Sequence, residues 1–193
     1  YRLVPAATVE QQAADVAAAV SYVKTNAGAL GVDARRIILM GHSAGAHLVA
    51  LVGTDPRYLA DAGLSFADIA GVIPLDGAAY DVPAQTKDGP QIMQATYAQA
   101  FGSDATRQKS LSPFHHATAP NAPAFLILHV DREDGTRQSE ALGAALRAAG
   151  SPVKLARVDG KGLQGHMAIN RRLGDPAYPA TALVDDWLRG VLN

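Results

Sequence analysis

The pentapeptide GHSAG at residues 41–45 constrains this chain more than any other feature of its sequence. It follows a short apolar run, 36–40, which is typical of a strand buried on both faces of a parallel sheet. Apolar residues suited to a helix follow it, from 44 to 52. A G-x-S-x-G turn between a strand and a helix is typical of a nucleophile elbow, which exposes a serine hydroxyl above the sheet. We therefore predict that Ser43 is a nucleophile.

The neighbours of Ser43 have expected roles in this turn. Gly41 and Gly45 are expected to omit side chains where the turn is too tight for them. The Ala44 N–H, at the start of the helix, is expected to point to the place where an oxyanion would form, with the positive end of the helix dipole beneath it. A dinucleotide-binding turn is a weaker alternative, because the run lacks G-x-G-x-x-G.

A serine nucleophile needs a base, and the base needs an acid that orients it. In elbow-type sites the acid follows the serine in the chain and the histidine comes last. His166, the last histidine, is expected in a flexible, glycine-rich loop after the final expected strand, and we predict that it is the general base. The acid stays open: Asp131 is nearest the end of strand 124–130, Asp134 is the second candidate, and Asp76, after strand 69–75, is the third.

The remaining histidines and the tryptophan have structural interpretations. His42 and His47 are expected to pack beside the nucleophile, and His129 to be a satisfied polar group near a strand end. The adjacent pair 115–116 makes a poor metal site without nearby carboxylates. Trp187 lies on an amphipathic segment and is expected to pack in the core.

Strand and helix patterns alternate along the whole chain. A helix is predicted to open at Thr8, where Thr8 and Gln11 fit a capping box. Further strands are predicted at 69–75, 124–130 and 153–158, and further helices at 91–101, 138–149, 165–172 and 181–192. This order predicts the α/β class, with a mostly parallel sheet and helices on both faces. We expect 1–193 to form a single domain, in which residues 77–122 cover the pocket.

Composition excludes several classes of function. The chain has 17 Lys+Arg against 18 Asp+Glu, so no strong positive charge attracts nucleic acid. It has no Cys, which removes thiolate nucleophiles and Cys-ligated zinc. No apolar run reaches the roughly 18 residues of a membrane span. A cytoplasmic location is the expectation, but the chain opens on Tyr1 rather than Met, so a signal peptide and export stay open.

Five segments resemble those of a known group. The chain is similar to the α/β-hydrolase superfamily, and within it to bacterial carboxylesterase and arylformamidase-like enzymes related to hormone-sensitive lipase. The matching segments are YRLVP at 1–5, DARRI at 33–37, GHSAGAHL at 41–48, QSEAL at 138–142 and GHMAIN at 165–170. The resemblance implies Ser43 as nucleophile, Asp131 as acid and His166 as base, with no cofactor and no metal.

The chain departs from that group in two places. The segment His129-Val130-Asp131 looks one residue shorter than the family's acid loop, which keeps the choice between Asp131 and Asp134 open. The family's H-G-G-x motif, which supplies further oxyanion N–H groups, has no match here. We therefore expect the first strands of the sheet to be missing from this chain, and an N-terminal segment of the same protein to complete the sheet and the oxyanion hole.

These observations predict a serine carboxylesterase that cleaves esters of small or medium acyl groups through an acyl-enzyme. The alternatives are an arylformamidase or amide hydrolase with the same triad, or a non-catalytic binding protein with the same fold. Tyr80, Tyr97, Phe101 and Phe114 are candidates for an apolar acyl pocket. The expected partner is a small-molecule ester, and a homo-oligomer is left open.

Overall fold

Four parallel strands in the order β1-β2-β3-β4 form the centre of this computed structural model, which describes all 193 residues. The strands are β1 (Ile38–His42), β2 (Gly71–Leu75), β3 (Phe125–Asp131) and β4 (Val153–Lys161). The helices are α1 (Val9–Thr25), α2 (Ala27–Leu30), α3 (Ala44–Thr54), α4 (Pro56–Asp61), α5 (Val82–Asp88), α6 (Gln94–Phe101), α7 (Ala105–Ser110), α8 (Pro113–His116), α9 (Glu133–Ala148), α10 (Gly162–Arg171) and α11 (Pro179–Leu192), with short 3-10 turns at Phe66–Asp68 and Gln91–Met93. The predicted α/β class with a parallel sheet is confirmed.

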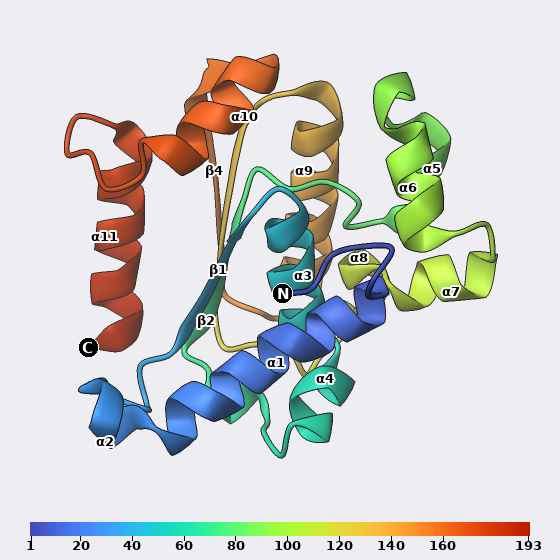
Figure 1. The fold of residues 1–193 in the computed structure, drawn as a ribbon. Helices are drawn as coiled ribbons and strands as arrows, with labels where there is room; N and C mark the ends of the chain where they lie inside the picture. The colour runs from blue at the N-terminus through green and yellow to red at the C-terminus, as the bar shows by residue number, and fades with distance from the viewer.

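Helices cover both faces of the sheet (Figure 1), with α11 on one side and α3 and α9 on the other. Because alternate strand residues face opposite sides, the two inner strands divide their apolar residues between two cores. Val72, Phe125 and Ile127 belong to the larger core, with α1, α3 and α9. The intervening Leu126 and Leu128 belong to the smaller core, with Trp187 and other residues of α11. The predicted core position of Trp187 is confirmed.

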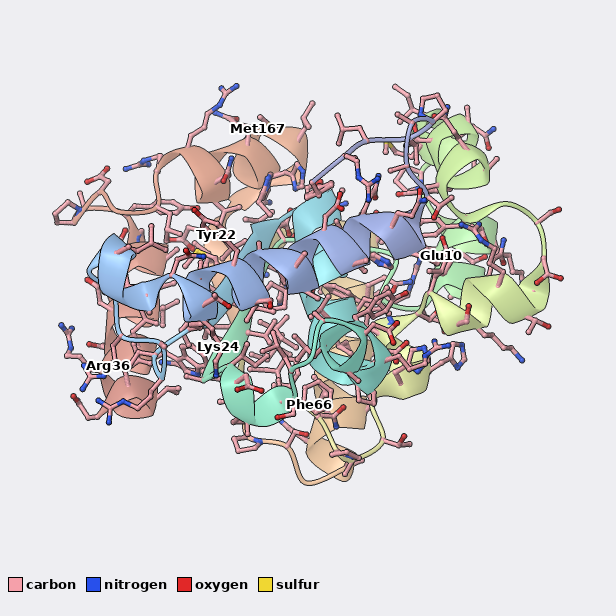
Figure 2. The ribbon with its side chains drawn as sticks, turned by 60° about the horizontal axis from the view of Figure 1, so that its bottom comes forward. Glu10, Tyr22, Lys24, Arg36, Phe66 and Met167 are labelled. Carbon is pink, nitrogen blue, oxygen red and sulfur yellow. The ribbon has the colours of Figure 1, made fainter.

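The start of α1 has the capping box that the sequence predicted. Thr8 Oγ1 accepts from the Gln11 N–H, and Gln11 Oε1 accepts from the Thr8 N–H. Figure 2 shows Glu10 at one end of α1 and Lys24 toward the other. Glu10 Oε1 accepts from Arg107 Nε at 2.8 Å, and Lys24 pairs with Asp68. These contacts fix α1 against α7 and against the turn at Phe66–Asp68.

Three sequence expectations about the elements are corrected. The nucleophile strand was expected to be buried on both faces, but β1 is the edge strand of the sheet and its Met40 is 43% exposed. Residues 77–122 contain α5, α6, α7 and α8 instead of one helical stretch. Helix α9 begins at Glu133, five residues before the predicted start, because the acidic first-turn residues Glu133 and Asp134 suit a helix N-terminus.

Candidate active site

The turn between β1 and α3 has the backbone of a nucleophile elbow. Ser43 has φ 57° and ψ −116°, in a region that non-glycine residues rarely adopt. A Cβ on Gly41 would lie 2.3 Å from the carbonyl oxygen of Gly45, so this position admits only glycine. A Cβ on Gly45 would meet no atom within 4 Å, which corrects the expectation that the turn is too tight there. The strained serine is held in place by its own N–H, which donates to Leu75 O at 3.0 Å.

Three side chains from three elements meet above the carboxyl edge of the sheet. His166 Nε2 lies 3.1 Å from Ser43 Oγ, and His166 Nδ1 lies 2.6 Å from Asp76 Oδ2. The parallel register explains why Ser43 and Asp76 are neighbours. The last residues of β1 and β2, His42 and Leu75, are paired, and Ser43 and Asp76 directly follow them in the chain. His166 lies on α10 and not in a flexible loop, because β4 extends to Lys161 and the helix begins directly after it.

The structure does not place Asp131 next to His166. This position contradicts the first-choice prediction that Asp131 is the acid that orients His166. A register shift between His129 and Asp131 pairs Asp131 with Lys161 at the end of β4. The Asp131 side chain is 50% exposed, and its Oδ2 lies 3.8 Å from Lys161 Nζ. The third-choice residue, Asp76, is the carboxylate within hydrogen-bonding distance of His166.

Asp134, the second choice, is buried but also does not touch His166 in the hydrogen-bond network. Its Oδ1 accepts from Arg132 Nη1 at 2.7 Å, and its Oδ2 accepts from Gln85 Nε2 at 2.9 Å. Because Asp134 lies in the first turn of α9 and not in a loop, its carboxylate is directed to α5. Both of its oxygens therefore serve contacts other than the histidine.

Asp76 is fully buried yet remains ionised. Burial by itself raises the pKa of this carboxyl, but the hydrogen bond from His166, the charge of Arg132 and the hydrogen bond from the Val130 N–H outweigh it and lower the pKa below its ordinary value. Asp76 Oδ1 accepts from Val130 N at 3.0 Å. A buried anion beside Nδ1 fixes the tautomer that leaves Nε2 free to accept the serine proton.

Ala44 is the first residue of α3, and its N–H is one of those that have no partner inside the helix. It lines the same cavity as Ser43 and His166. An oxyanion formed at the serine would lie near this N–H and near the positive end of the dipole of the 11-residue helix. This arrangement is the one that the sequence predicted for Ala44, and its role stays a prediction.

Two further histidines pack around the site. His42 Nε2 donates to the carbonyl oxygen of His166 at 2.8 Å, and the two rings lie 4.3 Å apart. Burial and the charge of His166 lower the pKa of His42. His47 is buried against Phe101, its Nδ1 lies 2.9 Å from Ala79 O, and burial lowers its pKa to about 4. The expectation that both histidines pack beside the nucleophile is confirmed.

A cavity of about 560 Å³ opens over Ser43 and His166. Its wall is mainly apolar and comes largely from the residues between β2 and α7 and from the first residues of the chain. Tyr97 and Phe101 line it, as predicted, whereas Tyr80 and Phe114 are not among its lining residues. Ile92, at its wall, is 90% exposed. The site could accommodate an uncharged ligand with an apolar portion.

Sequence reasoning missed one residue of this site, Arg132. Its guanidinium contacts both Asp76 and Asp134 and lines the cavity. The available signal was an arginine between two candidate carboxylates, since a cation is the usual partner of buried acids.

The structure contains no cluster of three or more His, Cys, Asp or Glu side chains that could hold a metal ion. None of its helices is long and apolar enough to cross a bilayer.

Known esterases share this fold. The propionate-bound esterase Est2 of the planctomycete Thermogutta terrifontis superposes with a TM-score of 0.73 at 25% identity, covering 99% of this chain and 70% of that one. Esterase B from Lactobacillus Rhamnosis (HN001) superposes with a TM-score of 0.76 at 20% identity, covering 99% of this chain and 63% of that one. The fold is therefore of the α/β-hydrolase type, as the resemblance predicted.

A sequence relative is described as a probable isoprenylcysteine alpha-carbonyl methylesterase of rice, Oryza sativa subsp. japonica. It is 27% identical over 176 residues, which are 83% of this chain and 42% of the relative. The chain thus spans less than half the length of that protein. The family model described as BD-FAE matches residues 1–146 of the 193. We conclude that this chain belongs to the BD-FAE family.

Proposed function

We propose that this chain carries the catalytic residues of a serine carboxylesterase that acts on esters of small or medium acyl groups. The observation that supports this most strongly is the hydrogen-bonded series from Ser43 Oγ through His166 to Asp76, at 3.1 and 2.6 Å. The series starts at a strained serine and ends on a buried carboxylate, as general-base activation of a hydroxyl requires.

In the proposed reaction, His166 Nε2 takes the Ser43 hydroxyl proton as Oγ attacks the ester carbonyl. The carbonyl π electrons move to the oxygen, and the resulting oxyanion accepts from the Ala44 N–H. As the tetrahedral intermediate collapses, the bond to the alcohol breaks and His166 gives its proton to that alcohol. Water then attacks the acyl-enzyme, with His166 again as base, and releases the acid and the free serine.

The size and lining of the cavity support the choice of substrate. A volume of about 560 Å³ with mainly apolar walls suits a short or medium hydrocarbon chain better than a charged ligand. The related Thermogutta esterase has structures with propionate and with butyrate bound. The acyl chain is expected to lie along Tyr97 and Phe101, which line the wall.

The test is labelling and turnover in the full chain. A fluorophosphonate probe should label the wild-type protein and not Ser43→Ala, and p-nitrophenyl acetate and butyrate should be hydrolysed only by the wild type. Absence of both labelling and turnover would favour a non-catalytic binding protein and contradict the proposal. Faster hydrolysis of N-formyl aromatic amines than of the esters would contradict the choice of esters.

We also propose that a strand from outside these 193 residues pairs with the open edge of β1 and brings a second oxyanion donor. An apolar groove of about 490 Å³ lies along β1 and α1, and Met40 is exposed in it. An unpaired edge with an apolar face is a site for a further strand. A chain extended with the protein's upstream sequence should gain about 10²–10³-fold in kcat; an unchanged kcat would contradict this part of the proposal.

A further inference from the structure

The Arg132 guanidinium donates hydrogen bonds to both the side chain and the main chain of Asp76. The Arg132 Nε–H donates to Asp76 Oδ2 at 3.2 Å, the same oxygen that accepts from His166. Its Nη2 donates to the carbonyl oxygens of Asp76 and Gly77, at 3.1 and 3.3 Å. One guanidinium therefore fixes the carboxylate and the backbone that bears it.

That backbone needs such support. Asp76 has φ 44°, a left-handed conformation that costs a non-glycine residue free energy and persists only where its surroundings hold it. Its N–H donates to Leu128 O at 2.7 Å, and the Arg132 contacts fix the next peptide as well. Without Arg132, only the Val130 N–H would hold the carboxylate toward His166, through the other oxygen, Oδ1.

The guanidinium itself is held on its other side. Its Nη1 donates to Asp134 Oδ1 at 2.7 Å, and Asp134 in turn accepts from Gln85 of α5. A Cβ on Gly135 would lie 2.8 Å from Arg132 Nη2, so the glycine leaves room for the arginine. The Arg132 side chain is mostly buried, and its planar fork is fixed between two carboxylates.

We propose that Arg132 is a positioning residue for the proposed triad: it holds the Asp76 carboxylate toward His166 Nδ1 and balances the negative charge of Asp76 and Asp134. This role rests on the proposed esterase function. With Asp76 and Asp134 ionised, Arg132 leaves one net negative charge, which the proton taken up by His166 neutralises during the reaction. Without Arg132, two buried carboxylates would face the histidine with no fixed cation.

The charge difference gives opposite predictions for two variants. Arg132→Met should lower kcat for p-nitrophenyl butyrate by up to ~10²-fold, as expected for a misplaced catalytic group, with little change in KM. The acidic limb of its kcat/KM profile should move to higher pH, because removing a cation favours protonation of the site. Asp134→Asn keeps an oxygen for Arg132 but removes an anion, and its acidic limb should move to lower pH. Arg132→Lys keeps the positive charge, so the acidic limb should lie at the same pH as in the wild type. Lysine lacks the planar fork of the guanidinium, so kcat should be only partly retained.

One other group around Asp76 and His166, His42, also responds to the charge of Arg132. Those that face Asp76 or His166 from the packed elements, besides Arg132, are His42, Tyr80, Asp134 and Tyr178. Burial raises the pKa of Tyr80 and Tyr178, so both stay neutral across the acidic limb. The charge of Arg132 also lowers the pKa of His42, so Arg132→Met shifts His42 and His166 in the same direction. Each profile is therefore also recorded in a His42→Gln background, where a difference between variants reports His166 alone.

Arg137→Met is the matched control, because Arg137 lies on α9, which begins directly after Arg132, and pairs only loosely with Glu133, at 3.9 Å. It should leave kcat and the pH profile unchanged. A second readout does not need hydrolysis: the low-field proton resonance of His166 Nδ1–H, assigned by its loss in Asp76→Asn, should weaken or move in Arg132→Met and stay in Arg137→Met. Circular dichroism checks that each variant is folded.

The outcomes separate the two proposals. If the wild type hydrolyses no ester, the proposed function fails, and the role of Arg132 is decided by the resonance alone. If the wild type is active but folded Arg132→Met keeps its resonance, its pH profile and a kcat within about twofold, the role of Arg132 is overturned. Shifts of the same sign in Arg132→Met and Asp134→Asn would also overturn it.

Discussion

Lowering the pH from 7 to 4 is expected to weaken the fold through His47. This side chain is buried beneath the site, where its Nδ1 lies 2.9 Å from Ala79 O and its Nε2 has no hydrogen-bond partner. Burial lowers its pKa to about 4 from an ordinary value of 6.5. The folded state therefore holds His47 neutral over a range in which the unfolded chain protonates it.

The sign and size follow from proton linkage. Between pH 6.5 and about 4 the unfolded state binds one more proton than the folded state, so the free energy of unfolding falls as the pH falls. The full contribution of His47 is present above pH 6.5. Each unit of difference is worth 1.36 kcal/mol, so a pKa lowered to about 4 corresponds to a loss of about 3 kcal/mol.

The assay is urea unfolding at half-unit steps from pH 7.5 to 4, for the wild type and for His47→Asn. The asparagine amide can still donate to Ala79 O but does not titrate, so its loss of volume should lower stability equally at every pH. His42, whose pKa is also lowered, contributes the same sign in both proteins and cancels in the difference. Equal pH slopes in the two proteins between 6.5 and 4 would refute the reasoning.

Two further predictions concern packing. Gly41→Ala puts a methyl group 2.3 Å from the Gly45 carbonyl oxygen and should displace the elbow, lowering fluorophosphonate labelling of Ser43 by ~10²-fold or more; Gly45→Ala, where a Cβ meets nothing within 4 Å, should label normally, and equal labelling of both variants would contradict this. Trp187→Ala should lower the free energy of unfolding by about 3–5 kcal/mol, because the indole packs in the smaller core against Gly71; a loss below about 1 kcal/mol by urea unfolding would contradict it.

The elbow and its two flanking elements could be predicted because they depend on residues adjacent in the sequence. The strand before Ser43, the helix after it and the glycine at 41 are all set by contacts within a few residues. The Thr8 capping box was predictable for the same reason. The position of β1 in the sheet could not be predicted, because an apolar strand has the same sequence pattern at an edge as in the centre. The exposure of Met40 follows from the strand order alone.

The acid could not be chosen from the sequence because its contact joins residues 90 positions apart. The sequence places Asp76, Asp131 and Asp134 at or just after strand ends, and strand position alone favours none of them. The choice depends on the register shift that pairs Asp131 with Lys161 and on the early start of α9, which turns Asp134 toward Arg132. An acidic pair at 133–134 could have indicated a helix N-terminus.

The assignment of Asp76 as the acid of the proposed triad is tested most directly by kcat for p-nitrophenyl butyrate in Asp76→Asn and Asp131→Asn. Asp76→Asn should lose about 10⁴-fold, as expected when the orienting carboxylate of a Ser-His-Asp site is removed. Asp131→Asn, at an exposed side chain paired only with Lys161, should stay within about twofold of the wild type. A large loss in Asp131→Asn with an active Asp76→Asn would contradict the account.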